Sequence, residues 1–301
     1  MPRRPVHGVL LLDKPVGLSS NDALQKARRL LDAEKAGHTG TLDPLASGLL
    51  PLCFGAATKF SQASLDADKR YLATLGLGRT TTTGDLEGVT ALERPVRLDR
   101  ADIDAALARF TGPIDQRPPM HSALKHEGRA LYEYAREGRE VERQVRRVTV
   151  RSIDLLSWAG PTLVLDVRCS KGTYIRTLAE DLGEALGCGA HLAALRRTGS
   201  GPLSIDDAIT LDALGELSAN DREARLKAPD ALLADWPEWR LSAAEAARFL
   251  TGLRRRVDAP DEPRVRVYGP GNRSLLGAAH ITAGELIPDR LLSPLEIQGM
   301  N

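Results

Sequence analysis

The segment 37–51, GHTGTLDPLASGLLP, restricts the fold more than any other stretch of the chain. It is too rich in glycine and proline to form one regular element, and too apolar for a solvated linker. We expect a partly buried loop, whose rigid backbone presents side chains for function. Asp43 is its only carboxylate, and Pro44 holds the backbone of Asp43 in an extended conformation. Asp43 is therefore a candidate functional acid, although an Asp-Pro pair that merely opens a turn remains an alternative.

Composition limits the class of protein. The chain has 301 residues, of which 42% are hydrophobic and 27% charged, as expected for a globular protein with a sizeable core. The net charge of +1 does not by itself indicate nucleic-acid binding, so only the distribution of charge can. Cys53, Cys169 and Cys188 are scattered, which argues against a zinc ribbon or a disulfide framework and favours a reducing cytoplasm. No signal peptide or transmembrane segment is expected.

Alternating and helical patterns define the N-terminal half. Residues 8–12 predict a buried strand, and residues 13–17 a turn in which Lys14 either contacts a phosphate or is simply solvated. A helix capped by Ser19 or Ser20 should then end near residue 34. Tyr71 opens a predicted strand, where it is either a core aromatic or a surface on which a base stacks. A polar loop at 80–88 and an amphipathic helix at 100–110 follow.

The segment 116–151 is the most unusual part of the chain. From residue 125 to 151 it carries eight Lys or Arg and five Glu, with Tyr132 and Tyr134 among them. Basic and aromatic residues together suit an RNA backbone with exposed bases, which makes Lys125, Arg129 and Arg136 candidate RNA contacts. A helix whose Glu and Arg residues pair with one another is the alternative.

Two strands at 148–155 and 163–168, with a turn at Gly160 and Pro161, lead into the sequence CSKGTYIRT at 169–177. A helix follows, and Arg176 falls in its first turn. A helix N-terminus favours anions, so a cation there suggests a partner outside the helix. Pairing of Arg176 with Glu180, four residues later, is the alternative.

The last hundred residues differ in character. Residues 204–235 are rich in acids and predict surface helices that lead to a linker at 236–238. The remainder predicts a helix at 243–250 and then short strands, which together form a small β-rich module. Its basic run at 254–256 is either a phosphate contact or a solvated turn.

Several motifs occur in an order that identifies a family. They are GVLLLDKP at 8–15, HTGTLDPLASG at 38–48, KRY at 69–71, the segment 119–134, CSKGTYIRT at 169–177 and LRRT at 195–198. Over residues 8–201 the chain closely resembles bacterial TruB-type tRNA pseudouridine synthases. After residue 201 it resembles a PUA-type RNA-binding domain only in position, length and β-rich pattern.

The resemblance implies an α+β fold of the pseudouridine synthase type, in which helices flank a mixed, mainly antiparallel sheet crossed by a catalytic cleft. It also implies a catalytic domain at 1–237, with an RNA-binding insertion at about 116–147, and a PUA-like domain at 238–301. The implied partner is the T-arm of tRNA, bound by a monomer in the cytoplasm.

The implied reaction converts uridine 55 in the TΨC loop of tRNA to pseudouridine, and help with tRNA folding is an implied second role. By the resemblance, Asp43 is the catalytic aspartate, Tyr71 faces the target base, and Arg176 pairs with Asp43. The resemblance assigns nucleotide binding to three further residues, which are His38, Tyr174 and Leu195.

The chemistry of the reaction agrees with the absence of familiar cofactor motifs. Isomerisation breaks the N1–C1′ bond and joins C5 to C1′ without redox change, so we expect neither cofactor nor metal. A carboxylate can stabilise or trap an electron-poor carbon, and a paired uridine must first be flipped out of its stack. Two alternatives remain from the residues alone: a hydrolase that uses Asp13 with Asp43, and a protein that refolds tRNA without chemistry.

Overall fold

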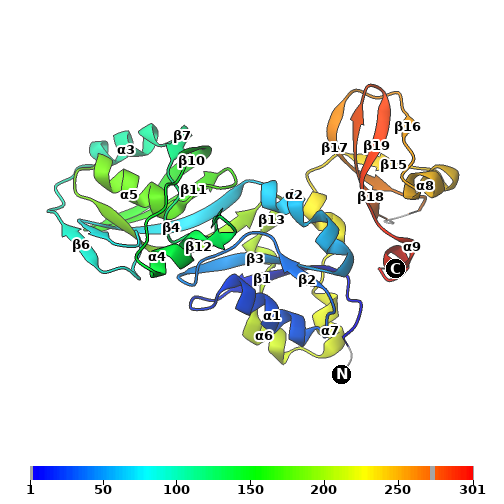
Figure 1. The fold of residues 1–301 in the computed structure, drawn as a ribbon, viewed down its shortest axis with the longest axis horizontal. Helices are drawn as coiled ribbons and strands as arrows, with labels where there is room; N and C mark the ends of the chain where they lie inside the picture. The colour runs from blue at the N-terminus through cyan, green and yellow to red at the C-terminus, as the bar shows by residue number, and fades with distance from the viewer. Residues whose placement is uncertain (1–2, 272–274, 301) are drawn as a thin grey trace.

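The structure, a computed structural model, describes residues 3–271 and 275–300 and contains a mixed ten-stranded sheet (Figure 1). The strands run in the order β14 (Ile209–Thr210), β1 (Gly8–Lys14), β3 (Ala46–Phe54), β12 (Ala190–Ser200), β4 (Lys69–Leu77), β11 (Thr162–Cys169), β10 (Arg146–Ala159) and β7 (Gly112–Gln116), with β13 (Leu203–Ser204) beside β12 and β2 (Ala36–His38) beside β3. The β1–β14 and β3–β12 pairs are parallel and the others antiparallel. The predicted α+β class with a mixed, mainly antiparallel sheet is confirmed.

Helices cover the sheet in two groups (Figure 1). Helices α3 (Arg100–Arg109) and α5 (Ile175–Ala185) bury their apolar faces against β4, β11 and β12 in one core. Helices α1 (Ser20–Leu30) and α6 (Leu211–Glu216) pack on β1 and β3 in a second core. Tyr71 and Leu195 contact both cores, so they lie at the seam between the two helix groups.

Local sequence explains where α1 begins and ends. Ser19 is the N-cap and its side chain accepts a hydrogen bond from the backbone N–H of Asp22, as the capping pattern predicts. The helix ends at Leu30 instead of near residue 34. Asp32 adopts a positive φ of 51°, a left-handed conformation that terminates a helix.

The prediction of one loop over residues 37–51 is wrong at both ends. Gly37 and His38 belong to β2, and β3 begins at Ala46, so the loop covers only residues 39–45. The apolar residues of β3 pair with β1 in antiparallel register, from Gly8 opposite Phe54 to Lys14 opposite Gly48. This pairing also places residues 13 and 14 in a strand, where a turn was expected. Burial of the apolar run outweighed the preference of its Gly and Pro residues for loops.

The segment between β7 and β10, where the sequence predicts an insertion, is compact. It contains the two-residue strands β8 (Lys125–His126) and β9 (Arg129–Ala130) and the helix α4 (Leu131–Arg136), whose Leu131 and Tyr134 are buried. The predicted loop at 80–88 is partly a hairpin of β5 (Arg79–Thr81) and β6 (Thr90–Glu93). The β10–β11 turn at Gly160 and Pro161 is confirmed.

The C-terminal residues form a second sheet (Figure 1). Its strand order is β15 (Glu238–Arg240), β17 (Glu262–Tyr268), β18 (Leu275–Thr282), β19 (Glu285–Leu291) and β16 (Arg255–Arg256), accompanied by α8 (Ala243–Leu250) and α9 (Pro294–Gln298). The prediction of a helix followed by a β-rich module is confirmed. The expected linker at 236–238 is partly structured, because Glu238 belongs to β15 and the carbonyl of Trp236 accepts a hydrogen bond from Arg266.

The residues between the two sheets connect them through an apolar core. They form the 3₁₀ segments η2 (Ile205–Asp207) and η3 (Pro229–Leu233) and the helices α6 and α7 (Ala219–Ala224). Leu232 and Leu233 of η3 pack in one cluster with Val9 of β1 and with Tyr268 and Leu275 of the second sheet. The segment 204–235, predicted to form surface helices, therefore also contributes buried residues to the core between the two sheets. In the described ranges, no helix is both long and apolar enough to cross a membrane.

Candidate active site

Residues far apart in the sequence line one cavity of about 340 Å³ at the seam of the two cores. Asp43 comes from the loop 39–45, Tyr71 from β4 and Leu195 from β12, while Tyr174 and Arg176 come from the start of α5. The structure thus brings together five of the residues to which the sequence assigned a role. The cavity is open enough to leave the Asp43 side chain 45% exposed.

The loop that carries Asp43 is held from both sides by hydrogen bonds. The hydroxyl of Ser20 donates to the carbonyl of Leu42 and accepts from the N–H of the same residue, at 3.0 and 2.7 Å. The N–H of Gly17 donates to the carbonyl of Pro44, and the N–H of Ala46 donates to the carbonyl of Asp43. These contacts fix the backbone around Asp43, so its carboxylate is presented by a rigid loop.

Arg176 is the centre of the polar network. Its Nη2 donates to Asp43 Oδ2 at 2.8 Å and to the carbonyl oxygen of His121 at 2.6 Å. Its Nη1 lies 3.2 Å from Asp85 Oδ2 and donates to the carbonyl of Thr83 at 3.4 Å. The expected partner outside the helix is therefore Asp43, and the alternative pairing with Glu180 is replaced by two acids from other segments. Because the guanidinium is planar and forked, one arginine can hold both.

Sequence reasoning missed Asp85. The stretch 80–88 has a polar, Gly-containing composition that predicts only a loop, and nothing in it indicates a partner in α5. In the structure Asp85 is buried, and its Oδ1 accepts hydrogen bonds from the Thr83 hydroxyl and the Glu87 N–H. Both oxygens of the Asp85 carboxylate therefore have partners, and Oδ2 holds Nη1 of Arg176.

Tyr71 faces the cavity from the middle of the sheet. It lies opposite Val167 of β11 and opposite Arg197 of β12. Burial raises the pKa of the Tyr71 phenol, and the positive charge of Arg197 opposes this rise. The phenol is therefore protonated at neutral pH.

Tyr174 is the N-cap residue of α5 and is held through its backbone. The side-chain amide of Gln116 accepts from the Tyr174 N–H at 3.0 Å and donates to the Tyr174 carbonyl at 3.3 Å. Burial raises the pKa of the Tyr174 phenol, which keeps it protonated. Gln116, at the end of β7, was not singled out by the sequence and anchors the insertion to the helix that carries Arg176.

His38 does not line the cavity. It is the half-buried last residue of β2, and among the described residues its Nδ1 atom is buried without a hydrogen-bond partner. Burial, with a smaller effect of the Arg197 charge, lowers the pKa of His38, so the imidazole is neutral at pH 7. A nucleotide-binding role for His38 stays a prediction.

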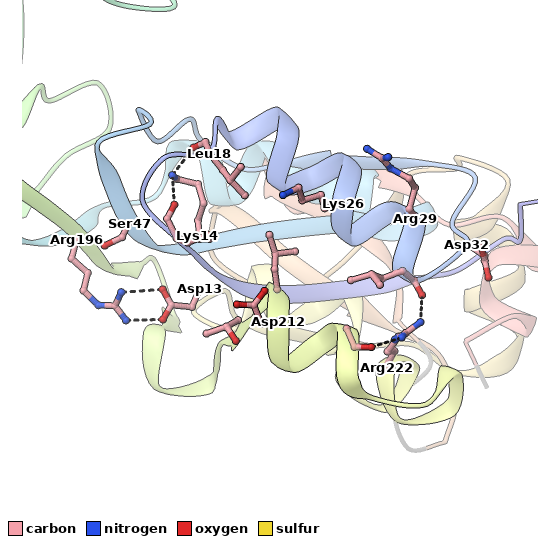
Figure 2. Close-up of a pocket in the computed structure, with 15 residues that line it drawn as sticks. Asp13, Lys14, Leu18, Lys26, Arg29, Asp32, Ser47, Arg196, Asp212 and Arg222 are labelled. Carbon is pink, nitrogen blue, oxygen red and sulfur yellow. Dashed lines mark hydrogen bonds and ion pairs between the residues drawn. The ribbon is translucent and has the colours of Figure 1, made fainter. Parts of the chain in front are cut away.

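The four basic residues proposed to contact RNA have different surroundings. Lys14 is fully buried, and its ammonium donates to the carbonyls of Pro15 and Leu18 in the turn that follows β1 (Figure 2). Burial lowers the pKa of Lys14 to about 8. Lys125 is exposed, Arg129 pairs with Glu133 and Glu137, and Arg136 lies over the ring of Tyr132. The structure therefore presents Lys125 and Arg136, but not Lys14, at the surface.

Asp13 and Asp43, the two acids of the hydrolase alternative, line different cavities. Asp13 lines a separate cavity of about 1070 Å³ between α1 and α6, where it forms a two-pronged ion pair with Arg196 at 3.0 and 2.7 Å (Figure 2). Neighbouring residues in a strand point to opposite faces, so Arg196 joins Asp13 while Leu195 and Arg197 line the cavity of Asp43.

Models of protein families match nearly the whole chain. A model described as TruB family pseudouridylate synthase (N terminal domain) matches residues 28–175. Models of the tRNA pseudouridylate synthase B C-terminal domain and of Pseudouridine synthase II TruB, C-terminal, match residues 176–235 and 237–292. A tRNA pseudouridine synthase B from Cupriavidus pinatubonensis is 60% identical over 302 residues, which cover 97% of this chain and 96% of that protein. The chain belongs to the TruB family of pseudouridylate synthases.

Other TruB relatives and solved structures agree. A tRNA pseudouridine synthase B from Burkholderia mallei is also 60% identical, over 97% of this chain and 99% of its own length. Among solved structures, a chain of a Cbf5-Nop10-Gar1 complex has a TM-score of 0.74 at 25% identity, covering 96% of this chain and 85% of its own. A chain of an H/ACA RNP bound to a substrate RNA containing 2′-deoxyuridine has a TM-score of 0.75 at 24% identity, covering 97% and 86%. The expected pseudouridine synthase fold is confirmed.

Proposed function

We propose that this TruB-family enzyme, a tRNA pseudouridine synthase, isomerises uridine 55 in the TΨC loop of tRNA, with Asp43 as the reacting carboxylate. The observation that carries the proposal is the 2.8 Å contact between Asp43 and Arg176 inside a cavity that Tyr71 also lines. Asp43 is half exposed toward that cavity, whereas Arg176 is almost fully covered by protein. A flipped nucleoside can therefore reach the acid while the cation stays in place.

The bond changes define what the site must supply. The N1–C1′ bond breaks, the ring turns, and a C5–C1′ bond forms; C5 loses a proton and N1 ends with one. No electron is transferred overall. An ionised Asp43 can stabilise or trap the carbon that becomes electron-poor, as carboxylates do in glycoside chemistry. The Arg176 guanidinium holds Asp43 Oδ2 at 2.8 Å and so fixes how the carboxylate faces the cavity.

Tyr71 supports the flipped base in this proposal. Extrusion of a stacked nucleotide costs a few kcal/mol. Stacking on an aromatic ring contributes about 1–3 kcal/mol, enough to offset much of that cost. Leu195 and Tyr174, which line the same cavity, would enclose the sugar and base from the other sides.

The rest of the chain is assigned to tRNA recognition. We assign residues 1–237 to catalysis, the insertion at 116–147 to contact with the T-arm, and the PUA-like domain at 238–301 to a further RNA contact. The insertion touches the site directly, since the His121 carbonyl accepts from Arg176 and Gln116 holds Tyr174. We propose that a monomer acts on tRNA in the cytoplasm and also assists tRNA folding.

The test uses Asp43→Asn, with Asp13→Asn as its matched control. Unmodified tRNA is incubated with each variant, and pseudouridine is mapped by position. Asp43→Asn should lower the single-turnover rate by about 10³-fold or more while tRNA binding stays within about threefold, because the substitution removes the reacting charge and little else. Asp13→Asn should retain the rate, because Asp13 lies in the other cavity.

Outcomes that contradict the proposal are distinct from one another. Pseudouridine formation by Asp43→Asn would remove Asp43 from its role. Modification at a position other than 55 would refute the substrate assignment. Release of free uracil would support a hydrolase, since isomerisation leaves the mass of the RNA unchanged. If the inactive Asp43→Asn variant also no longer promotes tRNA folding, the second role is not a separate activity.

A further inference from the structure

Among the described residues, Arg197 has the largest of the fully buried side chains, with an exposure of 1%. It lies on β12, lines the cavity of Asp43, and stands directly opposite Tyr71 in the β4–β12 pairing. Its immediate neighbour Arg196 points to the other face of the sheet and pairs with Asp13. Of these two adjacent arginines, Arg197 is buried and Arg196 is partly exposed and paired with an acid.

The hydrogen bonds of Arg197 hold the Asp43 loop on both of its sides. Its Nε donates to the carbonyl of Leu49 at 2.7 Å, and its Nη2 donates to the carbonyl of Gly40 at 3.2 Å. Gly40 and Leu49 lie on either side of Asp43 in the sequence, so one guanidinium holds both ends of the segment that carries the acid. Tyr71, which stands opposite Arg197 in the sheet, opposes the fall in pKa that burial causes at Arg197.

No carboxylate in residues 3–271 and 275–300 forms an ion pair with Arg197. A buried charge without an opposite charge is unfavourable, because the interior does not replace the lost hydration. A hydrophobic residue of similar size would fill the same space without this penalty. The arrangement is therefore poorly explained by stability alone, and charged groups buried beside a reactive cavity are candidates for function.

The backbone around Arg197 is also closely packed. Gly48 of β3 has a φ of +100°, and a Cβ atom at this position would lie 2.3 Å from the carbonyl oxygen of Arg197. Only glycine allows β3 and β12 to approach so closely here. The position of the Arg197 backbone is thus set by the strand that follows the Asp43 loop.

We propose that Arg197 is a positioning residue for the isomerisation: it clamps the Asp43 loop through Gly40 and Leu49 and holds that loop beside Tyr71, its partner in the sheet. The inference rests on the proposed function, in which Asp43 and Tyr71 meet the flipped nucleoside. Its effect on the rate comes from geometry, since the reacting groups must be held within a fraction of an ångström.

The experiment compares Arg197→Lys and Arg197→Gln with the same substitutions at Arg196. Arg197→Lys retains the charge but cannot hold both carbonyls, because a lysine offers one nitrogen in place of a fork. We expect both Arg197 variants to lower the single-turnover rate by about 100-fold, with the Kd for tRNA changed by less than about threefold. The Arg196 variants should keep the wild-type rate.

A second readout separates positioning from general damage. The protein has five tyrosines, so ¹³C labelling of their ring carbons gives few resonances, and Tyr71→Phe identifies that of Tyr71. Besides Arg197, the charged or titratable groups that act on Tyr71 are Cys169 of β11 and Asp43. Arg197→Gln should move the Tyr71 resonance at neutral pH and leave the other four in place, and Arg196→Gln should move none.

Three results would overturn the inference. The first is a wild-type rate in a folded Arg197→Gln or Arg197→Lys protein, and the second is an equal loss of rate in the Arg196 variants. The third is a rate that falls only in proportion to the unfolded fraction of the protein. If Arg197→Gln does not fold, Arg197→Lys decides. An active Asp43→Asn would instead refute the proposed function, whereas an inactive Asp43→Asn beside a fully active Arg197→Gln would refute the positioning role alone.

Discussion

Asp43 and Arg176 are joined across 2.8 Å, yet the two side chains differ sharply in their exposure, which is 45% for the acid and 7% for the base. The guanidinium also contacts Asp85 and the carbonyls of His121 and Thr83, whereas the carboxylate faces the cavity. Such an arrangement holds the charge of the acid in position before any ligand arrives. The acid can then act without a large rearrangement of its partner.

Replacement of Arg176 by lysine should lower the single-turnover rate by about 100-fold, because an ammonium cannot hold Asp43 and Asp85 together. The Kd for tRNA should change by less than about threefold. Quench-flow measurement of pseudouridine formation tests this. The control is Arg100→Lys, whose arginine pairs with Asp104 on the exposed face of α3 and should be replaceable. A rate for Arg176→Lys equal to that control would argue against the pairing.

Lys14 makes the stability of the protein depend on pH. Its pKa is about 8 in the folded protein and 10.5 in an unfolded chain. Between these values the unfolded chain binds more protons, so this group increases the free energy of unfolding as pH rises, by up to about 1.4 kcal/mol per pH unit. Urea unfolding across this range should show a steeper rise for wild type than for Lys14→Met. Substitution of the exposed Lys26 should leave the slope unchanged, and parallel wild-type and Lys14→Met curves would contradict the assignment.

Two arginines of the insertion, Arg136 and Arg129, should contribute unequally to tRNA binding. Arg136 lies 5.2 Å from the centre of the partly exposed Tyr132 ring, whereas Arg129 is engaged by Glu133 and Glu137 and lies over buried Tyr134. Arg136→Gln should therefore reduce the slope of log affinity against log salt by about one, the value for one phosphate contact. Arg129→Gln should change it less. Binding titrations over a series of salt concentrations measure both slopes. If both variants keep the wild-type slope, neither arginine contacts a phosphate of the RNA.

Gly48 and Gly112 form a matched pair for testing the contact between β3 and β12. Their φ values are +100° and +103°, but an added Cβ meets the Arg197 backbone at Gly48 and open space at Gly112. Gly112→Ala should destabilise the protein by about 1–3 kcal/mol through backbone strain alone. Gly48→Ala should destabilise the protein more than Gly112→Ala does. It should also impair isomerisation, because β12 must shift. Equal unfolding free energies for the two variants would show that the strands adjust freely.

Strong local patterns could be read from the sequence. The capped start and buried face of α1, the helix α3 and the β10–β11 turn agree with their predictions, because periodicity, capping and turn residues act within a few positions. The order of six motifs was enough to indicate the family and to select Asp43, Tyr71 and Arg176. Motifs of this kind combine residue identity with spacing, and both are visible without coordinates.

Other features depended on contacts between distant segments. Asp85 joins Arg176 from a loop of ordinary composition, Lys14 turns inward to its own backbone, and His38 ends outside the cavity. The roles of the adjacent Arg196 and Arg197 also separate only when β12 pairs with β3 and β4, which sends one side chain to each face. The sequence alone therefore determined the family and most of the regular elements, and it proposed Asp43 as the reacting acid. The tertiary structure decided which charges surround that acid, since burial and sheet register bring together residues more than a hundred positions apart.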